Sequence, residues 1–435
     1  MTASDATTVL RCGVFIDGSG IPASEDTGVV IDGDEIVAIA PWGELGVSGE
    51  YRDFRHCTVI PGIIDGHTHI CLGSPSSPSW TTTAGDPIGV VAWGLASSCA
   101  SLLSGVTTVI DAGSSDGLAL RVSALIKSGV ALGSRVLAAG PAITTTGGHG
   151  ASFGIRADNT DEIVKAVRAN VSAGADYVKI MVTGGAITPQ SNRRRSQYGQ
   201  DELDAAIADA HRLNRKVIGH ANCTEGITLS VRAGIDIVAH CNWLGERPGT
   251  VEVDLHTVDL MEAQGTWIDL NIQGAFRDIE EADGRVVSVQ PDDPTPRTRW
   301  ELLRPLAERG IGIYLTSDGF GPSIGSFTKQ LSVVESRDVA SPEGLVSHVT
   351  SSPAKALGLA ERLGSLQVGK LADLVVLDGD LRADRACLVK PLSVFRSGVE
   401  EVSDGLLRPP PLLGRAGMEL NAQADLLATV FRELD

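Results

Sequence analysis

"PGIIDGHTHI", residues 61–70, is an apolar run that ends in two histidines, His67 and His69. Side chains at positions i and i+2 of a strand lie on the same face, so the two imidazoles project side by side. Two neutral imidazoles directed at one point suit Zn²⁺ or a similar divalent ion. The structural alternative has one histidine at the end of a strand and the other in solvent, and the motif alone leaves both open.

The composition predicts a globular protein with a large core. The chain has 435 residues, of which 43% are hydrophobic, and this is enough for one large barrel or two to three smaller domains. The net charge of −18 argues against nucleic acid or an anionic membrane as a partner. The uncharged stretch 88–110 contains many Ser, Thr and Gly residues, and it is better explained as a core helix followed by a buried strand than as a membrane span.

The cysteines and the N-terminus predict a cytoplasmic location. Seven cysteines without CxxC spacing are typical of free thiols in a reducing compartment. The first residues, "MTASDATTVL", lack the basic and apolar regions of a signal peptide.

Both ends of the chain have the texture of short strands. Residues 28–41, "GVVIDGDEIVAIAP", are two β-rich runs around Asp-Gly-Asp, which is typical of a hairpin. Residues 364–404 look alike. We therefore expect a small β-sandwich built from residues 1–60 and 363–404, followed by a tail over 405–435 in which 416–435 has helical spacing.

The middle of the chain, residues 61–362, alternates β-branched runs with helical patterns, which is typical of βα units and a parallel sheet. Eight strands are expected, at residues 59–70, 106–113, 135–140, 177–182, 216–220, 235–240, 266–271 and 311–318. Helices over 160–174 and 201–214 would begin at a Thr and an Asp cap. Eight such units predict an α/β fold of the (β/α)8 TIM-barrel type.

Polar side chains stand at the expected ends of these strands. They are His67 and His69 on the first strand, His220 on the fifth, His240 on the sixth and Asp318 on the eighth. The carboxyl ends of the strands of a TIM barrel meet at one rim, where the chemistry of such enzymes takes place. Four histidines and a carboxylate on that rim predict a metal site.

Lys179 lies inside the fourth expected strand, between Val178 and Ile180, where a charge is costly unless it is paired or coordinated. An ammonium group repels a divalent ion and has no lone pair to offer. Lys179 is therefore either a buried lysine paired with Asp318, or its amine has reacted with CO₂ to give a carbamate that bridges two metals. Apolar neighbours favour that reaction because they lower the pKa of the amine.

The ordered set of motifs resembles the amidohydrolase superfamily over nearly the whole chain. The motifs are "PGIIDGHTHI", "VKIMVTGG" (178–185), "VIGHA" (217–221), "IVAHCNW" (237–243), "LTSDG" (315–319) and "LGSLQVGKLADLVVLD" (363–378). "SGVTTVIDAG" (104–113) and "GPAITTTGGHG" (140–150), with the lysine, resemble the branch of Xaa-Pro and Xaa-Arg dipeptidases, and imidazolonepropionase-like enzymes are more distant relatives.

The resemblance implies a binuclear centre of two divalent ions, zinc before manganese, cobalt or iron. The first ion would be held by His67, His69, carboxylated Lys179 and Asp318, and the second by Lys179, His220 and His240. A hydroxide between the ions would attack, and Asp318 would pass its proton to the leaving nitrogen. The resemblance also implies a small-molecule substrate and is compatible with a homo-oligomer, although no segment identifies an interface.

The residues that contact the substrate are less well determined. His149, in the Gly-rich "TTTGGHG", would hydrogen-bond the substrate carbonyl or lie in solvent. "SNRRRSQYGQDEL" (191–203) brings Tyr198 and Arg193, with two further arginines, towards the same rim, and arginine pairs well with a carboxylate. A solvated charge run is the alternative for these arginines.

Asn222 departs from the dipeptidase-like pattern, which commonly has a tyrosine two residues after the histidine of the fifth strand. The chain also has Ser-Asp-Gly at 317–319 where Thr-Asp-Ala-Gly is common. A neutral amide suits a carbonyl or amide partner. We therefore expect Asn222 to favour N-acyl compounds, carbamates, ureas or cyclic amides over dipeptides.

These features together predict a metal-dependent hydrolase of a C–N bond next to a carbonyl. The alternatives are a dipeptidase of the Xaa-Pro or Xaa-Arg type, a mononuclear deaminase and a non-catalytic barrel that serves as a scaffold. Such deaminases carry a glutamate three residues after the histidine of the fifth strand, where this chain has Cys223. The metal content would separate the three classes, since two ions per chain favour the hydrolase, one the deaminase and none the scaffold.

Overall fold

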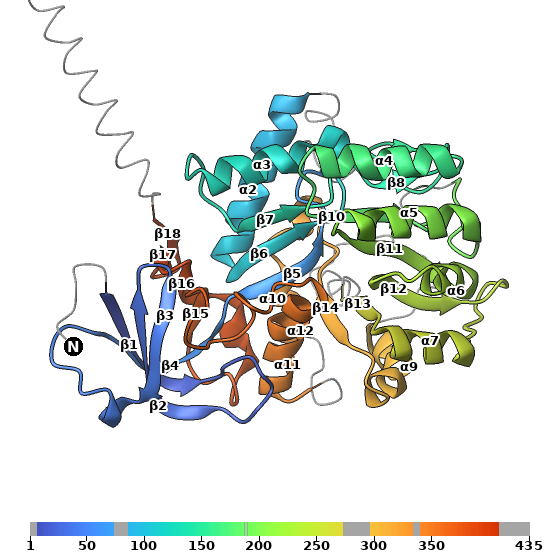
Figure 1. The fold of residues 1–435 in the computed structure, drawn as a ribbon. Coiled ribbons are helices and arrows are strands. Elements are labelled where there is room, and N and C mark those ends of the chain that lie inside the picture. Colours follow the sequence, from blue (N-terminus) through green and yellow to red (C-terminus); the bar gives the residue numbers. More distant parts are fainter. Residues whose placement is uncertain are drawn as a thin grey trace, which may run out of the picture.

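The computed structural model describes residues 7–73, 86–186, 188, 190–272, 296–333 and 340–408. Within these residues the strands form an eight-stranded sheet of mixed direction and two sheets of parallel strands, one of seven and one of three strands (Figure 1). The protein therefore has an α/β fold with parallel sheets.

The eight-stranded sheet contains strands from both ends of the chain, in the order β18-β17-β16-β15-β4-β1-β2-β3. Its strands are β1 (Thr7–Phe15), β2 (Ser24–Asp32), β3 (Glu35–Pro41), β4 (Arg52–Pro61), β15 (Leu374–Asp378), β16 (Pro391–Arg396), β17 (Val399–Ser403) and β18 (Leu406–Leu407). The antiparallel pair β4–β15 joins the two halves. The hairpin expected around Asp-Gly-Asp is confirmed as β2–β3, with Gly33 at a φ of 60° in its turn.

In the part of the chain that the structure describes, the parallel strands are eight that overlap the predicted strands and two short ones, between residues 143 and 156, that the sequence did not predict. They are β5 (Ile63–Thr68), β6 (Val106–Asp111), β7 (Arg135–Ala138), β8 (Ile143–Thr144), β9 (Ile155–Arg156), β10 (Tyr177–Met181), β11 (Lys216–Cys223), β12 (Ile237–Leu244), β13 (Trp267–Asn271) and β14 (Ile313–Thr316). The smaller sheet is β5-β6-β7, and the larger is β14-β13-β12-β11-β10-β8-β9. Contacts join the two sheets on both sides, because Thr68 bridges to Gly319 and Asp176 N donates to Ala138 O (2.8 Å).

The prediction of one continuous strand over residues 59–70 is wrong, because the segment belongs to two strands, β4 and β5. The chain leaves the eight-stranded sheet after Pro61 and enters the three-stranded sheet at Ile63. Gly62 makes this transfer, with its N–H donating to Asp373 O (2.8 Å). A Cβ atom at Gly62 would overlap the Thr107 side chain, so the close approach of the two sheets requires glycine here.

Two strand ends also differ from the expected ones. His220 and His240 do not close their strands, because β11 continues to Cys223 and β12 to Leu244. Neither segment contains a proline or glycine that would end it. Both histidines consequently lie within the ladder, where Ala221 pairs with His240.

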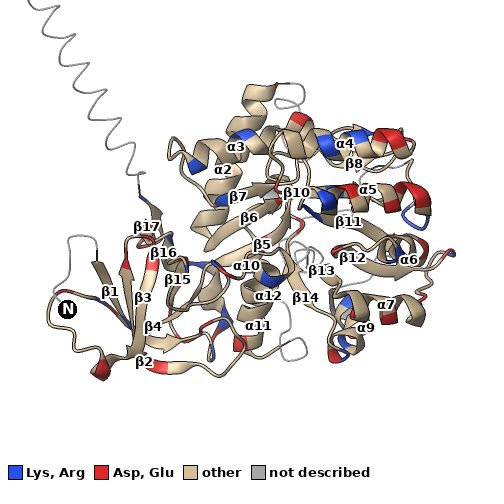
Figure 2. Ribbon diagram, viewed as in Figure 1, with Lys and Arg blue, Asp and Glu red and all other residues tan. Residues whose placement is uncertain are grey.

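Helices follow most of the parallel strands. They are α2 (Pro87–Leu103), α3 (Leu118–Lys127), α4 (Thr160–Ser172), α5 (Gln200–Arg212), α6 (Thr224–Arg232), α7 (Leu255–Gln264), α9 (Pro296–Glu308), α10 (Phe327–Val333), α11 (Pro342–Val349) and α12 (Ser351–Ala356). The expected Thr cap of α4 is wrong by one residue, because the Asn159 side chain accepts from Glu162 N. Charged residues of both signs are frequent along α4 and α5 (Figure 2).

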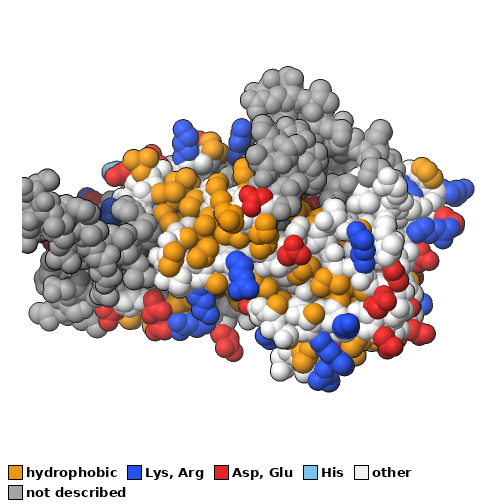
Figure 3. Space-filling view, turned by 90° about the horizontal axis from the view of Figure 1, so that it is seen from above, with side chains coloured by type: hydrophobic (Ala, Val, Ile, Leu, Met, Phe, Trp, Pro, Cys, Tyr) orange, Lys and Arg blue, Asp and Glu red, His pale blue; other side chains and the backbone are white. Residues whose placement is uncertain are grey.

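The stretch 88–110 forms α2 and then the buried strand β6, as predicted. The helix is only half buried, since Val90 and Leu102 lie in the core while Ile88 is 81% exposed. Figure 3 shows a broad group of hydrophobic side chains on the face seen from above. Among the helices that the structure describes, none has the length and apolar character to span a membrane. The helix expected at 416–435 lies outside the described residues.

Candidate metal centre

The first part of the site is formed by His67 and His69 at the end of β5. Their rings lie on one side of the strand, with centroids 5.4 Å apart, and both are buried. His67 Nδ1 lies 2.6 Å from Asp269 Oδ2, and His69 Nδ1 lies 3.0 Å from Gly113 O. Because an acceptor faces each Nδ1, both Nε2 atoms are left with a lone pair.

Asp318 joins these histidines from the segment after β14. His69 N donates to Gly319 O (2.8 Å), which draws the two segments together. Asp318 Oδ1 lies 3.5 Å from His67 Nε2 and 3.6 Å from His69 Nε2. One ligand atom from each of the three residues lies within 4.8 Å of the other two, so this donor set fits a divalent cation such as zinc.

The second part of the site is the pair His220 and His240 on neighbouring strands. His220 Nδ1 and His240 Nε2 are 2.7 Å apart, and the ring centroids are separated by 4.3 Å. The backbone of His240, Cys241 and Trp243 has φ values of 70°, 50° and 50°, a conformation that is strained for residues other than glycine. The strained segment turns His240 towards His67, whose ring centroid is 5.4 Å away.

Lys179, on β10, is fully buried, and its Nζ lies 2.9 Å from His67 Nε2. Its strand pairs with β11, and Met181 at the end of β10 lies beside His220 of β11. Lys179 thus reaches towards the first part of the site from a strand adjacent to the second part. The pairing with Asp318 that the sequence left open is an electrostatic attraction here, since Asp318 raises the pKa of Lys179 while the Nζ atom contacts His67.

Burial controls the charges in the site. It lowers the pKa of Lys179 to about 8, although Asp269, Asp318 and Asp111 oppose it. Burial also lowers the pKa of all four histidines well below the ordinary value and raises the pKa of Asp318 to about 7. The imidazoles are therefore neutral at pH 7, which is the form that binds a metal ion.

His149 and Asn222 are the two residues proposed for substrate contact that the structure brings against the histidines, and His149 is the more deeply placed against a ring. Its ring centroid is 4.4 Å from that of His220, it is 5% exposed, and its Nδ1 has no hydrogen-bond partner among the described residues. It is a buried residue and not a loop histidine in solvent. Thr144 Oγ1 and Gln197 Oε1 hold its backbone.

The other three predicted contacts lie elsewhere or are occupied. The Tyr198 hydroxyl donates to Ala157 O (3.0 Å) within the hydrophobic core. The Asn222 amide contacts His220 Nε2 (2.8 Å) and Asn242 (2.7 Å). Arg193 is half-buried, and the next arginine, Arg194, donates to Gly245 O (2.8 Å). Tyr198 is therefore a core residue in this structure, and Asn222 faces a histidine.

A model of the amidohydrolase family matches residues 58–402. The chain belongs to the amidohydrolase family. This confirms the resemblance drawn from the motifs, and the protein is a metal-dependent hydrolase that acts on C–N bonds. The alternative of a non-catalytic scaffold is thereby set aside.

This amidohydrolase is similar to several known proteins over most of its length. It is 23% identical to ochratoxinase from Aspergillus niger over 428 residues, covering 89% of this chain and 84% of the relative. It is 25% identical to imidazolonepropionase from Pseudomonas fluorescens (strain Pf0-1), covering 83% and 90%. The crystal structure of a Xaa-Pro dipeptidase with bound methionine in the active site is similar with a TM-score of 0.77 and 25% identity, covering 91% and 99%.

Sequence reasoning missed the residues that orient the ligands of the amidohydrolase. Asp269 is fully buried and accepts from Thr316 Oγ1 (2.5 Å) as well as contacting His67. Asn271 Nδ2 lies 2.6 Å from His240 Nδ1 and 3.2 Å from Asp318 Oδ2. Asp269 could have been found by the argument used for Lys179, since "TWIDLN" (266–271) places a carboxylate inside an apolar run.

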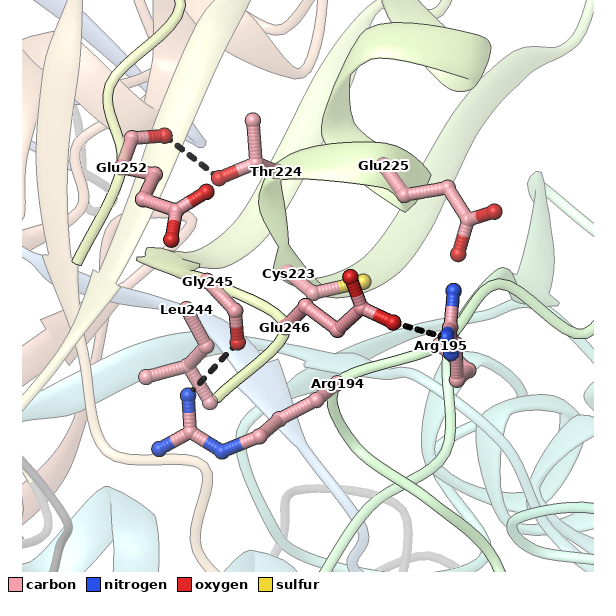
Figure 4. Close-up of a pocket in the computed structure, with 9 residues that line it drawn as sticks. All are labelled: Arg194, Arg195, Cys223, Thr224, Glu225, Leu244, Gly245, Glu246 and Glu252. Atoms are coloured by element: carbon pink, nitrogen blue, oxygen red, sulfur yellow. Dashed lines mark hydrogen bonds and ion pairs between the residues drawn. The ribbon is translucent and has the colours of Figure 1, made fainter. Parts of the chain in front are cut away.

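A cavity of about 230 Å³ lies beside the strand ends of β11 and β12 (Figure 4). Its walls come from the turn after β11, the segment after β12 and the arginines before α5. In Figure 4, Arg195 pairs with Glu246, Arg194 points to the Gly245 carbonyl and Thr224 donates to Glu252 O. Arg194 and Arg195, two of the three arginines expected near a substrate carboxylate, are thus engaged by this chain's own acceptors.

Proposed function

We propose that this amidohydrolase uses two divalent cations to cleave a C–N bond next to a carbonyl in an amide, N-acyl compound, carbamate, urea or cyclic amide. The observation that carries the proposal is the proximity of two groups of metal-binding side chains, His67–His69–Asp318 and His220–His240, with the buried Lys179 against His67 and the His240 ring 5.4 Å from that of His67. Two neighbouring groups of this kind fit a binuclear centre better than the single ion of a deaminase.

The architecture proposed for this site is a closed (β/α)8 barrel, residues 61–362, beside a small β-sandwich, residues 1–60 and 363–404, with a tail over 405–435. The Thr68–Gly319 bridge and the Asp176–Ala138 hydrogen bond support closure, since they join the two parallel sheets on both sides. In such a barrel the strand ends of β5, β10, β11, β12 and β14 share one rim.

His67, His69 and Asp318 would hold the first cation, and His220 and His240 the second. Lys179 would join both as a carbamate, formed when its neutral amine adds to CO₂ and releases a proton. Its full burial and its 2.9 Å contact with the ligand atom His67 Nε2 support this role. When bound, the two cations would polarise the substrate carbonyl and make a water molecule a better nucleophile.

Asp318 would move the proton. Its Oδ1 faces the two histidines of β5, while Oδ2 accepts from Asn271 (3.2 Å), so the carboxylate is held in one orientation. From there it would take a proton from the attacking water and give it to the leaving nitrogen. His149, buried against His220, would donate to the substrate carbonyl oxygen.

Dipeptides are a second candidate class, favoured by the similarity to the Xaa-Pro dipeptidase structure. Neutral substrates are supported instead, because three residues that could bind a substrate carboxylate already have partners within this chain. Tyr198 is bonded in the core, Arg194 is bonded to backbone carbonyls and Arg195 is paired with Glu246.

The first test is a mass-spectrometric screen of the zinc- or manganese-loaded enzyme against dipeptides, N-acyl amino acids, carbamates, ureas and cyclic amides. The Asp318→Asn variant serves as the blank, and Asp201→Asn on the exposed start of α5 is the control for an Asp-to-Asn change. We expect cleavage of neutral compounds by the wild type, and a loss of about 10²–10⁴-fold in Asp318→Asn with both cations still bound.

Cleavage confined to dipeptides and N-acyl amino acids would show that a free carboxylate is recognised, with Arg193 as the residue to test next. Full activity of Asp318→Asn would remove Asp318 from proton transfer.

A further inference from the structure

A series of hydrogen bonds runs from Arg299 through Asn271 and His240 to His220. The direction of donation along it can be determined from Arg299. The Arg299 guanidinium donates to the Asn271 amide oxygen, because arginine has no acceptor. The Asn271 amide nitrogen then faces His240 Nδ1 (2.6 Å), and His240 Nε2 faces His220 Nδ1 (2.7 Å). Followed from Arg299, each group donates to the next, so His220 Nδ1 is an acceptor.

The other side of the His220 ring gives the same answer independently. Nε2 lies 3.2 Å from Gly184 O, and a carbonyl oxygen can only accept. Nε2 therefore carries the hydrogen, and Nδ1 carries the lone pair that faces His240. In this tautomer His220 offers its Nδ1 lone pair to a cation, and His240 joins it as a ligand only when its own hydrogen moves from Nε2 to Nδ1.

The Asn222 amide must then present its oxygen to His220. Its amide nitrogen lies 2.8 Å from Nε2, where two donors would face each other, and a turn of the amide by 180° preserves this distance. Asn242 turns with it, so that the 2.7 Å contact between the two amides keeps a donor and an acceptor. Asn242 has one amide end without a partner among the described residues, so it does not oppose the turn.

We propose that Asn222 is a positioning residue of the second cation site, whose amide oxygen acts with the Gly184 carbonyl to hold His220 with its Nδ1 lone pair directed at His240. This inference rests on the proposed function, since it concerns the second cation. It gives Asn222 a role in metal binding in place of the substrate contact expected for it, because the side chain is only 7% exposed and faces the histidine.

The test compares Asn222→Leu, which removes the acceptor at similar volume, with Asn222→Asp, which keeps it. Zinc affinity is measured by competition with a chelator, and no substrate is needed. We expect Asn222→Leu to bind one of the two zinc ions about 10–100-fold more weakly, and Asn222→Asp to bind both as the wild type does. The matched control is Thr228→Val on α6, the helix that follows β11, which removes the hydrogen bond to Thr257 (2.9 Å) and leaves the Asn222 amide and the Gly184 carbonyl intact.

Two results would overturn the inference. One is wild-type affinity for both ions in Asn222→Leu, which together with a raised KM would make Asn222 a substrate contact. The other is an equal loss in Thr228→Val, which would mean that any disturbance beside β11 weakens zinc binding.

The tautomer is read separately from ¹⁵N-histidine NMR spectra, so that failure of the proposed function can be distinguished. A wild-type chain that binds fewer than two zinc ions but has His220 protonated on Nε2 contradicts the binuclear centre and supports only the hydrogen bonds that orient His220. His220 protonated on Nδ1 contradicts the inference itself.

Discussion

Gly185 lies against the His149 imidazole so closely that a Cβ atom at this position would overlap the ring. Its φ does not require glycine, so the contact alone accounts for the residue. We expect Gly185→Ala to destabilise the protein by about 1–3 kcal/mol and to lower kcat by displacing His149. Denaturant unfolding and steady-state kinetics measure the two effects.

The double variant Gly185→Ala with His149→Ala identifies the cause. Without the His149 ring, Gly185→Ala should change the free energy of unfolding very little. The effects of Gly185→Ala and His149→Ala on that free energy should therefore be strongly non-additive. Gly43→Ala is the control, because no atom lies near its Cβ position, and its effect should stay within about 0.5 kcal/mol. A cost for Gly185→Ala that persists without His149 would contradict this explanation.

Lys179 is the second residue whose role can be tested directly. If its carbamate joins the two cations, Lys179→Ala should lose most activity and one cation, and formate or propionate should restore part of the rate by occupying the space that the side chain leaves. Lys179→Met is the matched control, because its side chain fills that space and should prevent rescue. An unchanged rate and metal content in Lys179→Ala would rule out the bridge.

At the scale of elements, α4 and α5 are held together by one carboxylate. Asp209 on α5 accepts from Arg168 on α4 (2.9 and 3.1 Å) and from Arg212 (2.9 and 2.7 Å). The hydrogen bonds from Arg168, and then those from Arg212, lower the pKa of Asp209. The stabilisation is therefore fully present above the unfolded-state pKa of about 4 and is lost as the pH falls through the lower folded-state pKa.

We expect Asp209→Asn to lower the stability at pH 7 by about 1 kcal/mol or less, since both arginines are largely exposed. The difference from the wild type should disappear as the pH falls through the lowered folded-state pKa of Asp209, below which both chains carry a neutral group. Thermal melting between pH 2 and 7 measures this, with Glu361→Gln as the exposed control. A difference that stays constant with pH would contradict the assignment.

The existence of most elements could be predicted, because β-branched runs and helical spacing are local signals. Their ends could not. β11 and β12 extend three or four residues beyond His220 and His240 because neighbouring strands continue to pair with them, which no local pattern records. The transfer at Gly62 depends on Thr107 and Asp373, which are far away in the sequence.

At the scale of the whole molecule, Arg135 connects the eight-stranded sheet to the three-stranded one. From β7 it donates to Asp373 (2.6 and 3.1 Å), to Ser397 (2.9 Å) and to Thr108 (2.9 Å). Arg135→Ala would leave the Asp373 carboxylate buried and without this partner, so we expect a loss of about 3 kcal/mol in denaturant unfolding. Arg382→Ala, which breaks the exposed pair with Asp380, should cost about 1 kcal/mol or less. A loss of the same size in both variants would contradict the argument.

The candidate site was predictable only in its inner layer. His67, His69, His220, His240, Lys179 and Asp318 stand out as polar residues at or within expected strands, and the structure brings them together. Their supports depend on which strands meet in space. Tyr198 shows the opposite error, since proximity in sequence to a rim segment does not decide whether a side chain turns into the core.

The pairing of β4 with β15 has a consequence for how the protein is made. Pro61 and Leu374 lie side by side in one sheet, but about 300 residues must leave the ribosome between them. At roughly 5–20 residues per second, β4 waits between about 15 and 60 seconds for its partner strand. During that time its edge is open to other chains, so a nascent chain stalled before residue 374 should depend on chaperones far more than the finished protein does.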